Sequence, residues 1–301
     1  MEWIADPGVG AWLRETLDDG LGSMHAVVPR GFPAYARVFH PATVRQSPTA
    51  ADSEVRVSWA QTAAAFGTTM HAEAQWHRIV RTAVDADWRT RIAPDGREFT
   101  APLEGALDSD LVSILAGHLA AHTATPDDGV VALWDGFGAL VGFFGDGPSR
   151  AFLTFSDDPN HQAMLDRSIH DPFNNVFRKP TWQDGILSRE ISEGPRLQLP
   201  GRDYVLFSGG ARDFIDPAWV LGVPWRDRVG EEHGFPPSAQ SPNILWPADH
   251  AWVMVSEIDY DSTIVAGSPD LVRAICTDER LEAKALREGA DLTWDADEVN
   301  R

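Results

Sequence analysis

The sequence contains a single cysteine, Cys276, so no disulfide can form within the chain and no cysteine cluster can hold a metal. It also lacks an apolar run long enough to cross a membrane. The first residues, MEWIADPGVG, show no basic segment followed by an apolar stretch. These absences predict a cytoplasmic protein that does not span a membrane.

Basic residues are scarce relative to acidic ones. The 301 residues include 25 lysines and arginines against 45 aspartates and glutamates, which gives a formal net charge of -20. Proteins that bind nucleic acid through its phosphates, or that bind an anionic membrane surface, need clustered positive charge. The charge therefore argues against both partner classes and leaves a basic protein partner open.

Known catalytic and cofactor-binding signatures are missing as well. The chain has no P-loop, no HExxH zinc motif, no EF-hand loop and no GxSxG nucleophile turn. Residues 135–142 imitate a dinucleotide-binding loop after a predicted strand. However, the glycines that follow and Pro148 leave no room for the helix whose N-terminus would hold the pyrophosphate. We therefore expect no cofactor and interpret this run as a hairpin.

Two histidines, His118 and His122, stand four residues apart on a predicted helix, so they share one face. A pair with this spacing can hold zinc. Residue 119 is leucine rather than the glutamate of a metalloprotease motif, and no third ligand is evident. We therefore interpret both histidines as structural residues at the edge of the helix.

Apolar patterns predict short strands interrupted by helices of different lengths. Helices are predicted at 9–17, 58–66, 108–123 and after residue 268, and strands at 27–28, 35–39, 130–134, 151–155, 196–199, 204–207, 251–258 and 263–266. Because no regular βαβ rhythm appears, we expect an α+β fold with a largely antiparallel sheet, hairpins and packed helices. We expect one domain over residues 1–301, with an irregular insertion at about 157–195.

The stretch SPNILWPADHAWVMVSEIDYDSTIVAGS, residues 241–268, carries the strongest local signals. Its residues 251–258 alternate as in a half-buried strand, with Trp252 on the more apolar face. We expect a central strand with Trp252 as a buried anchor, a hairpin turn near Asp261, and a helix capped by Ser268.

Two groups in this stretch are candidates for function. The acids on the second face of the strand could bind Mg²⁺ or Ca²⁺ or act as acid and base, or they could be the solvated end of a hairpin. The two tryptophans flank a turn stiffened by Pro247, and they could anchor a partner on a rigid rim or belong to the core. The candidate binding residues are Trp246, Asp249, His250, Trp252, Glu257, Asp259 and Asp261.

The same stretch resembles the C-terminal signature of a family of uncharacterised actinobacterial proteins, roughly SPN-x-WWP-x-DRAW followed by EID-x-x-x-T-x-V-x-GS. Residues 25–42, HAVVPRGFPAYARVFHPA, resemble the N-terminal signature of that family. His250 departs from the arginine of the signature, which argues against an essential cation there. The resemblance implies a fixed local structure and assigns no role to any residue.

Missing catalytic signatures, strong acidity and twelve tryptophans together favour a protein that binds or regulates a protein partner. Bacterial immunity proteins share these broad traits, which is an analogy and not a motif match. The alternative is an enzyme, such as a metal-assisted hydrolase, that uses the acidic cluster of Glu257, Asp259 and Asp261.

Overall fold

The structure, a computed structural model, describes residues 1–19, 23–46, 54–83, 86–145 and 179–301. The strand predicted at 151–155 and the first part of the predicted insertion, up to residue 178, lie outside the described residues.

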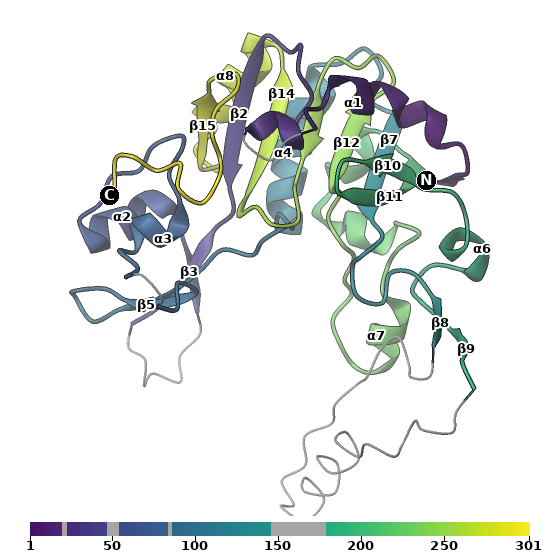
Figure 1. Ribbon diagram of the computed structural model, residues 1–301, viewed down its shortest axis with the longest axis horizontal. Coiled ribbons are helices and arrows are strands. Elements are labelled where there is room, and N and C mark those ends of the chain that lie inside the picture. Colours follow the sequence, from purple (N-terminus) through teal and green to yellow (C-terminus); the bar gives the residue numbers. More distant parts are fainter. Residues whose placement is uncertain (20–22, 47–53, 84–85, 146–178) are drawn as a thin grey trace, which may run out of the picture.

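A nine-stranded sheet forms the centre of the molecule (Figure 1). Its order is β1 (Trp3–Ile4), β11 (Arg202–Ser208), β7 (Gly129–Trp134), β12 (Ile244–Pro247), β13 (Val253–Val255), β14 (Ser262–Gly267), β2 (Ala34–Phe39) and β15 (Ala283–Leu286), and β10 (Leu197–Leu199) also pairs with β11. Every pairing in this sheet is antiparallel. Together with the helices packed on it, the sheet confirms the predicted α+β class.

Both faces of the sheet are covered, because side chains alternate along each strand and both sets are apolar. In β13, Met254 faces one layer, while Val253 and Val255 face the other. In Figure 1, α1 lies in front of the sheet and α4 behind it. The layer with Met254 contains α4 (Ser109–Ala121), α8 (Pro269–Thr277), η3 (Ala211–Phe214) and η4 (Pro217–Leu221), and the opposite layer contains η1 (Pro7–Gly10), α1 (Ala11–Thr16) and η2 (Met24–Ala26).

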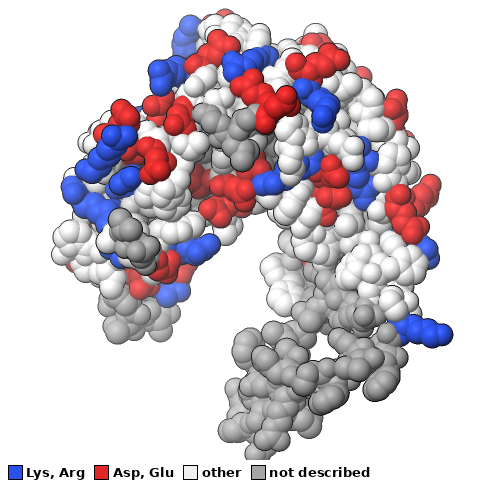
Figure 2. All heavy atoms as spheres, viewed as in Figure 1, with Lys and Arg blue, Asp and Glu red and all other residues white. Residues whose placement is uncertain are grey.

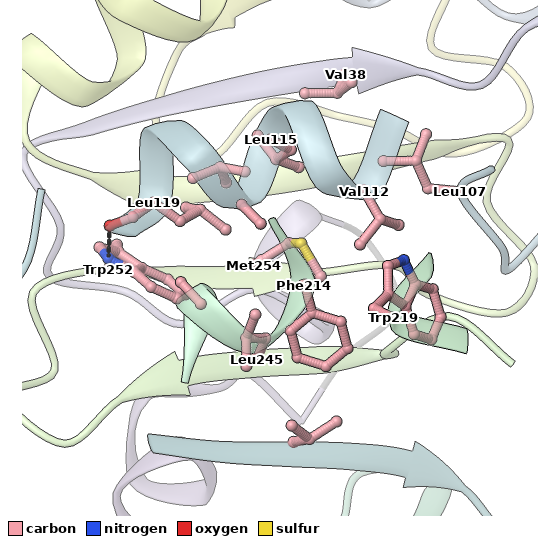
Figure 3. Close-up of a cluster of buried hydrophobic side chains, with 14 of the residues drawn as sticks. Val38, Leu107, Val112, Leu115, Leu119, Phe214, Trp219, Leu245, Trp252 and Met254 are labelled. Carbon is pink, nitrogen blue, oxygen red and sulfur yellow. Dashed lines mark hydrogen bonds between the residues drawn. The ribbon is translucent and has the colours of Figure 1, made fainter. Parts of the chain in front are cut away.

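Trp252 is the anchor of the layer behind the sheet (Figure 3). Its side chain is 0% exposed. Its indole Nε1 donates a hydrogen bond of 2.9 Å to the backbone oxygen of Leu119, near the end of α4. In α4, apolar residues such as Leu115 and Leu119 recur every three to four residues, so one stripe of the helix faces the sheet. The prediction that Trp252 is a buried anchor is confirmed, although Trp252 immediately precedes the central strand β13 rather than lying on it.

A smaller antiparallel sheet has a core of its own, ordered β4 (Val55–Val57), β3 (Ala42–Arg45), β6 (Glu98–Thr100) and β5 (Thr90–Ile92). It packs with α2 (Trp59–Phe66) and α3 (Trp76–Ile79). A capping box begins α2, because Ser58 Oγ accepts from Gln61 N and Gln61 Oε1 accepts from Ser58 N. The remaining described elements are β8 (Phe143–Gly145), β9 (Thr181–Gln183), α6 (Arg189–Ser192) and α7 (Arg228–Glu232).

The strand predicted at 251–258 is shorter than expected. It comprises only Val253–Val255, and the chain turns at 257–260, where Tyr260 N donates to Glu257 O at 3.0 Å. The expectation of three acids on one face of a continuous strand is therefore wrong, because the acids lie along this turn and its exit. The expectation of a turn at Asp261 is wrong as well, since the turn comes earlier and β14 already begins at Ser262.

Candidate functional site

The seven candidate residues separate into two groups at opposite ends of β13. Trp246, Asp249, His250 and Trp252 lie before this strand, and Glu257, Asp259 and Asp261 lie after it. Three strand residues rise roughly 10 Å. The two groups therefore do not form one site.

The group before β13 has structural contacts. Trp246 and Trp252 are both buried, so neither ring is open to a partner, and the structure favours the core interpretation over the rim interpretation. Asp249 accepts hydrogen bonds from Thr123 Oγ1 and Ala124 N, each at 2.7 Å, and so joins this turn to the segment after α4. His250 stacks on Trp12 with ring centroids 4.4 Å apart.

The acids after β13 are held by two arginines. Arg202 Nε lies 3.2 Å from Glu257 Oε1, and Arg202 Nη2 lies 2.6 Å from Asp259 Oδ2. Arg37 Nη2 lies 3.1 Å from Asp261 Oδ1. The surroundings of the three acids differ, since the side chain of Glu257 is 6% exposed and that of Asp259 is 72% exposed. The three acids thus line the same cavity, but each already has a cationic partner.

Arg37 is the most constrained cation of the site. Its side chain is 2% exposed. Its Nε donates to Ser262 Oγ at 2.8 Å, and its Nη1 donates to the backbone oxygens of Ala74 at 2.8 Å and Ala72 at 3.2 Å. Its guanidinium also lies 4.5 Å from the centroid of the Phe39 ring. An arginine can be buried in this way because all three of its nitrogens find acceptors.

These acids line a cavity of about 560 Å³. The size falls in the range of ligand pockets, roughly 300–1,000 Å³. Its lining comes from segments far apart in the sequence, from Asp18 near the N-terminus to Trp294 near the C-terminus. In Figure 2, acidic side chains gather in the middle of this face, around the lower end of β14 in Figure 1. The charged lining residues are Asp18, Asp19, Glu104, Glu257, Asp259, Asp261, Arg37 and Arg202.

Aromatic residues form another part of the lining, and Trp294 is central to it. Trp294 is 52% exposed. It stacks on His77 with ring centroids 3.7 Å apart and an interplanar angle of 3°, and it meets Trp88 edge-to-face at 5.8 Å. Trp76 and Tyr260 also line the cavity. The C-terminal tail therefore contributes an indole to the cavity, and the stack on His77 holds that indole against α3.

A hydrogen-bonded carboxylate fixes the tail that carries Trp294. Asp297 has no exposed surface and accepts from His71 Nε2 at 2.9 Å, Gln75 N at 3.2 Å and Asn300 N at 2.9 Å. Burial acts to raise its pKa, but these hydrogen bonds outweigh it and hold the pKa of Asp297 below its ordinary value. The tail is thereby bound to the segment that precedes α3.

Gly105 brings the loop that carries Glu104 onto the β13–β14 turn. Gly105 N donates to Tyr260 O at 2.9 Å, and its φ is +73°. A Cβ at this position would lie 2.8 Å from Ile258 Cα, so only glycine fits the approach without a shift. Glu104 thus joins the acids of the turn although it is distant from them in sequence.

Burial and neighbouring charges shift the pKa values of these groups. Burial raises the pKa of Glu257, and burial followed by the charge of Asp261 raises the pKa of Glu104. Burial, followed by the charge of Glu257, raises the pKa of Tyr260 to about 12. In contrast, burial and then Arg78 lower the pKa of His77 to about 4, so its imidazole is neutral at pH 7. Perturbed groups that share a cavity are typical of functional sites.

The predicted metal chemistry receives little support from the geometry. Among the described residues, no group of three His, Cys, Asp or Glu side chains could hold a metal ion. His118 Nε2 lies 2.8 Å from Asp278 Oδ2, and His122 Nδ1 lies 2.8 Å from the backbone oxygen of His118, as expected of structural histidines. Residues 135–142 are a run of turns and bends rather than the helix that a dinucleotide would need.

Several cavity residues are absent from the candidates found in the sequence: Arg37, His77, Trp88, Glu104, Arg202 and Trp294. The sequence did contain a signal that could have identified Arg37. In the apolar strand Tyr-Ala-Arg-Val-Phe an arginine can be buried only if other groups pair with it. Glu104 and His77 carry no such signal, since only the tertiary fold brings them to the turn.

Comparison with protein-family models, curated proteins and solved structures finds no match for this chain. No helix among the described residues has the length and apolar character that a membrane crossing requires.

Proposed function

We propose that the chain is a cytoplasmic binding protein with a regulatory, immunity-like role, and that the cavity beside the β13–β14 turn receives a group from its protein partner. One observation carries this proposal. Segments from both ends of the chain build a pocket of about 560 Å³ in which a half-exposed indole, Trp294, lies among carboxylates held in place by arginines.

The preformed state of the cavity supports binding. Arg37, Arg202 and Gly105 fix the acidic turn before any ligand arrives, which lowers the entropy that binding would otherwise cost. A partly exposed tryptophan in a concave site is typical of an energetic anchor in protein recognition. The net charge of -20 favours a basic partner through long-range attraction.

A second candidate function is acid–base catalysis in the same cavity. It rests on the shared position of Glu104 and Glu257 in the cavity and on their raised pKa values, since a raised pKa brings a carboxyl closer to the pH at which it can donate a proton. A metal-assisted form has less support, because Arg37 and Arg202 occupy carboxylate oxygens that a metal ion would need as ligands. A turnover assay separates the candidates, since catalysis predicts a turnover by the parent chain that Glu257→Gln abolishes, whereas the binding function predicts no turnover.

Affinity purification of the full chain from its native host tests the binding proposal. We expect a stoichiometric partner that is recovered with the parent protein and with Trp182→Ala, whose ring lies outside the cavity. We expect the same partner to be lost with Trp294→Ala. Equal recovery by both variants would show that the cavity is not the contact site and would overturn the proposal.

A further inference from the structure

We propose that the group bound in the cavity is an organic cation, a guanidinium or alkylammonium group on an apolar stem. This inference rests on the proposed binding function and adds the chemistry of the ligand. A basic side chain of a partner protein and a free small amine share this chemistry.

The first support is the charge of the lining. Six carboxylates and two arginines line the cavity. Arg37 pairs with Asp261, and Arg202 is shared between Glu257 and Asp259. Asp18 pairs with Arg30, which is not part of the lining. With every lining arginine engaged, carboxylates remain in excess, so the field in the cavity favours a cation.

Glu104 is the acid best placed to meet that cation. Glu104 is exposed, and within the described part of the chain its side chain takes part in no hydrogen bond and no ion pair. Three like charges act on it. Burial and the neighbouring Asp261, Asp259 and Glu257 act together to raise its pKa, while Arg89 opposes them. A positive charge beside Glu104 would relieve this repulsion.

The second support is aromatic. A cation is attracted to the face of an indole, and Trp294 presents a half-exposed indole in the cavity. The chain already uses this contact nearby, because the Arg89 guanidinium lies 4.6 Å from the centroid of Trp88 and that of Arg37 lies 4.5 Å from the centroid of Phe39. An apolar stem would lie against the remaining ring surface.

The third support is an unsatisfied group. His77 is 5% exposed and lines the cavity, and its Nε2 is buried without a hydrogen-bond partner in the described structure. A buried polar atom without a partner is uncommon and often marks a position that a ligand or water satisfies. Because its pKa is about 4, the imidazole is neutral at pH 7 and does not oppose a cation.

Anions fit the cavity poorly. The guanidinium nitrogens of Arg37 and Arg202 already donate to carboxylates, a hydroxyl or backbone oxygens, so no lining arginine is left for a phosphate or carboxylate ligand. A neutral ligand such as a sugar would gain nothing from the excess of carboxylates. Binding of a neutral ligand becomes an outcome of the test.

The test is calorimetric titration of the full chain at pH 7 with four probes: N-acetyl-arginine amide, N-acetyl-citrulline amide, spermidine and glucose. Citrulline has nearly the shape of arginine without the charge. We expect the arginine compound or spermidine to bind at least about tenfold more tightly than the citrulline compound, with affinity that falls as salt rises. Tighter binding of the arginine compound than of spermidine points to a side chain of a partner, and the reverse order points to a free amine.

Variants locate the binding. Glu104→Gln and Trp294→Ala should each weaken the cation by about tenfold or more. Asp270→Asn, an exposed acid of α8 outside the cavity, should leave the affinity unchanged. Circular dichroism confirms that each variant is folded.

The inference is overturned if no cation binds at millimolar concentration, if citrulline or glucose binds as tightly, or if Glu104→Gln has no effect. Binding of a neutral probe that Trp294→Ala abolishes would overturn the cation class and leave the binding function standing. A partner captured equally well by Trp294→Ala would overturn the binding function itself.

Discussion

The guanidinium of Arg37 and the carboxylate of Asp261 form an ion pair, 3.1 Å between Nη2 and Oδ1, in the wall of the cavity. Arg37 comes from β2 and Asp261 from the exit of the β13–β14 turn, so the pair fixes the acidic turn to the neighbouring strand. The same guanidinium donates to the backbone oxygens of Ala72 and Ala74, before α3. Arg37 therefore connects three segments of the chain: β2, the β13–β14 turn and the segment before α3.

Replacing Arg37 by Met should be strongly destabilising. The change leaves the Asp261 carboxylate and two buried backbone oxygens without their donor, and breaking a buried pair on one side costs roughly 3–5 kcal/mol. Urea unfolding measures the free energy difference. Arg273→Met is the control, because Arg273 forms an exposed pair with Asp270, and its loss should cost about 0–1 kcal/mol. Equal stability of the two variants would contradict the anchoring role of Arg37.

Replacing Trp252 by Ala should also be costly. The ring is fully buried and its Nε1 is bonded to Leu119 O, so its loss leaves a large cavity beneath α4, at a cost of roughly 3–5 kcal/mol. Trp294→Ala removes a half-exposed ring and mainly its stack on His77, at a cost of about 1 kcal/mol. Denaturant unfolding of both variants measures the difference, and a Trp252→Ala protein as stable as the parent would contradict the core assignment.

The pH dependence of the unfolding free energy should report the protonation of His40. It is buried between Leu103 O, 2.7 Å from its Nδ1, and Thr263 Oγ1, 2.9 Å from its Nε2. Burial lowers its pKa from 6.5 to about 4. In the unfolded chain the ring takes up a proton near pH 6.5, whereas in the folded protein it does so only near pH 4. Stability should therefore fall as the pH decreases through this window, by about 3 kcal/mol at roughly 1.4 kcal/mol per pKa unit.

The variant His40→Gln isolates this contribution. Because the substitution also changes the absolute stability, the slope of unfolding free energy against pH is the quantity to compare. We expect a smaller loss of stability between pH 6.5 and 4 in the variant, since the other titrating groups are shared. Parallel curves for parent and variant would show that His40 titrates normally in the folded protein.

Asp297 should control the order of the C-terminal tail. Asp297→Ala removes the acceptor for His71, Gln75 and Asn300, so amide hydrogens of residues 291–301 should exchange faster while those of the large sheet keep their protection. Asp295→Ala changes an 82% exposed side chain and should leave exchange in the tail almost unchanged. If Asp297→Ala left the tail equally protected, the hydrogen bonds of Asp297 would not be what holds Trp294 in place.

Much of the fold could be predicted from local patterns in the sequence. The helices predicted at 58–66 and 108–123 and the Ser268 cap of α8 follow from neighbouring residues, and the structure contains α2, α4 and this cap. The hairpin was predicted as well, but the position of its turn was not. Alternation continues through the acids in the sequence, whereas a hydrogen bond from Tyr260 N to Glu257 O closes the turn earlier.

The cavity could be predicted only in part. Glu257, Asp259 and Asp261 follow one another closely, so their proximity was readable from the chain, but their arginine partners lie on β2 and at the start of β11. Trp294 and Glu104 reach the site through long-range contacts that no local pattern encodes. The single-domain organisation and the resemblance to an actinobacterial family stay predictions.

The most direct test of the cavity as the binding site uses its tryptophans as reporters. The chain has twelve tryptophans, and each indole N–H group gives a signal in a ¹H–¹⁵N correlation NMR spectrum of the ¹⁵N-labelled chain. Each signal is assigned by substituting the tryptophan that produces it. Titration with a fragment set that contains cationic, neutral and anionic members should shift the indole signals of Trp294 and Trp88 and leave those of the buried Trp246 and Trp252 in place. A set in which no fragment moves Trp294, or in which binding shifts only indoles outside the cavity, would contradict the assignment of this cavity as the functional site.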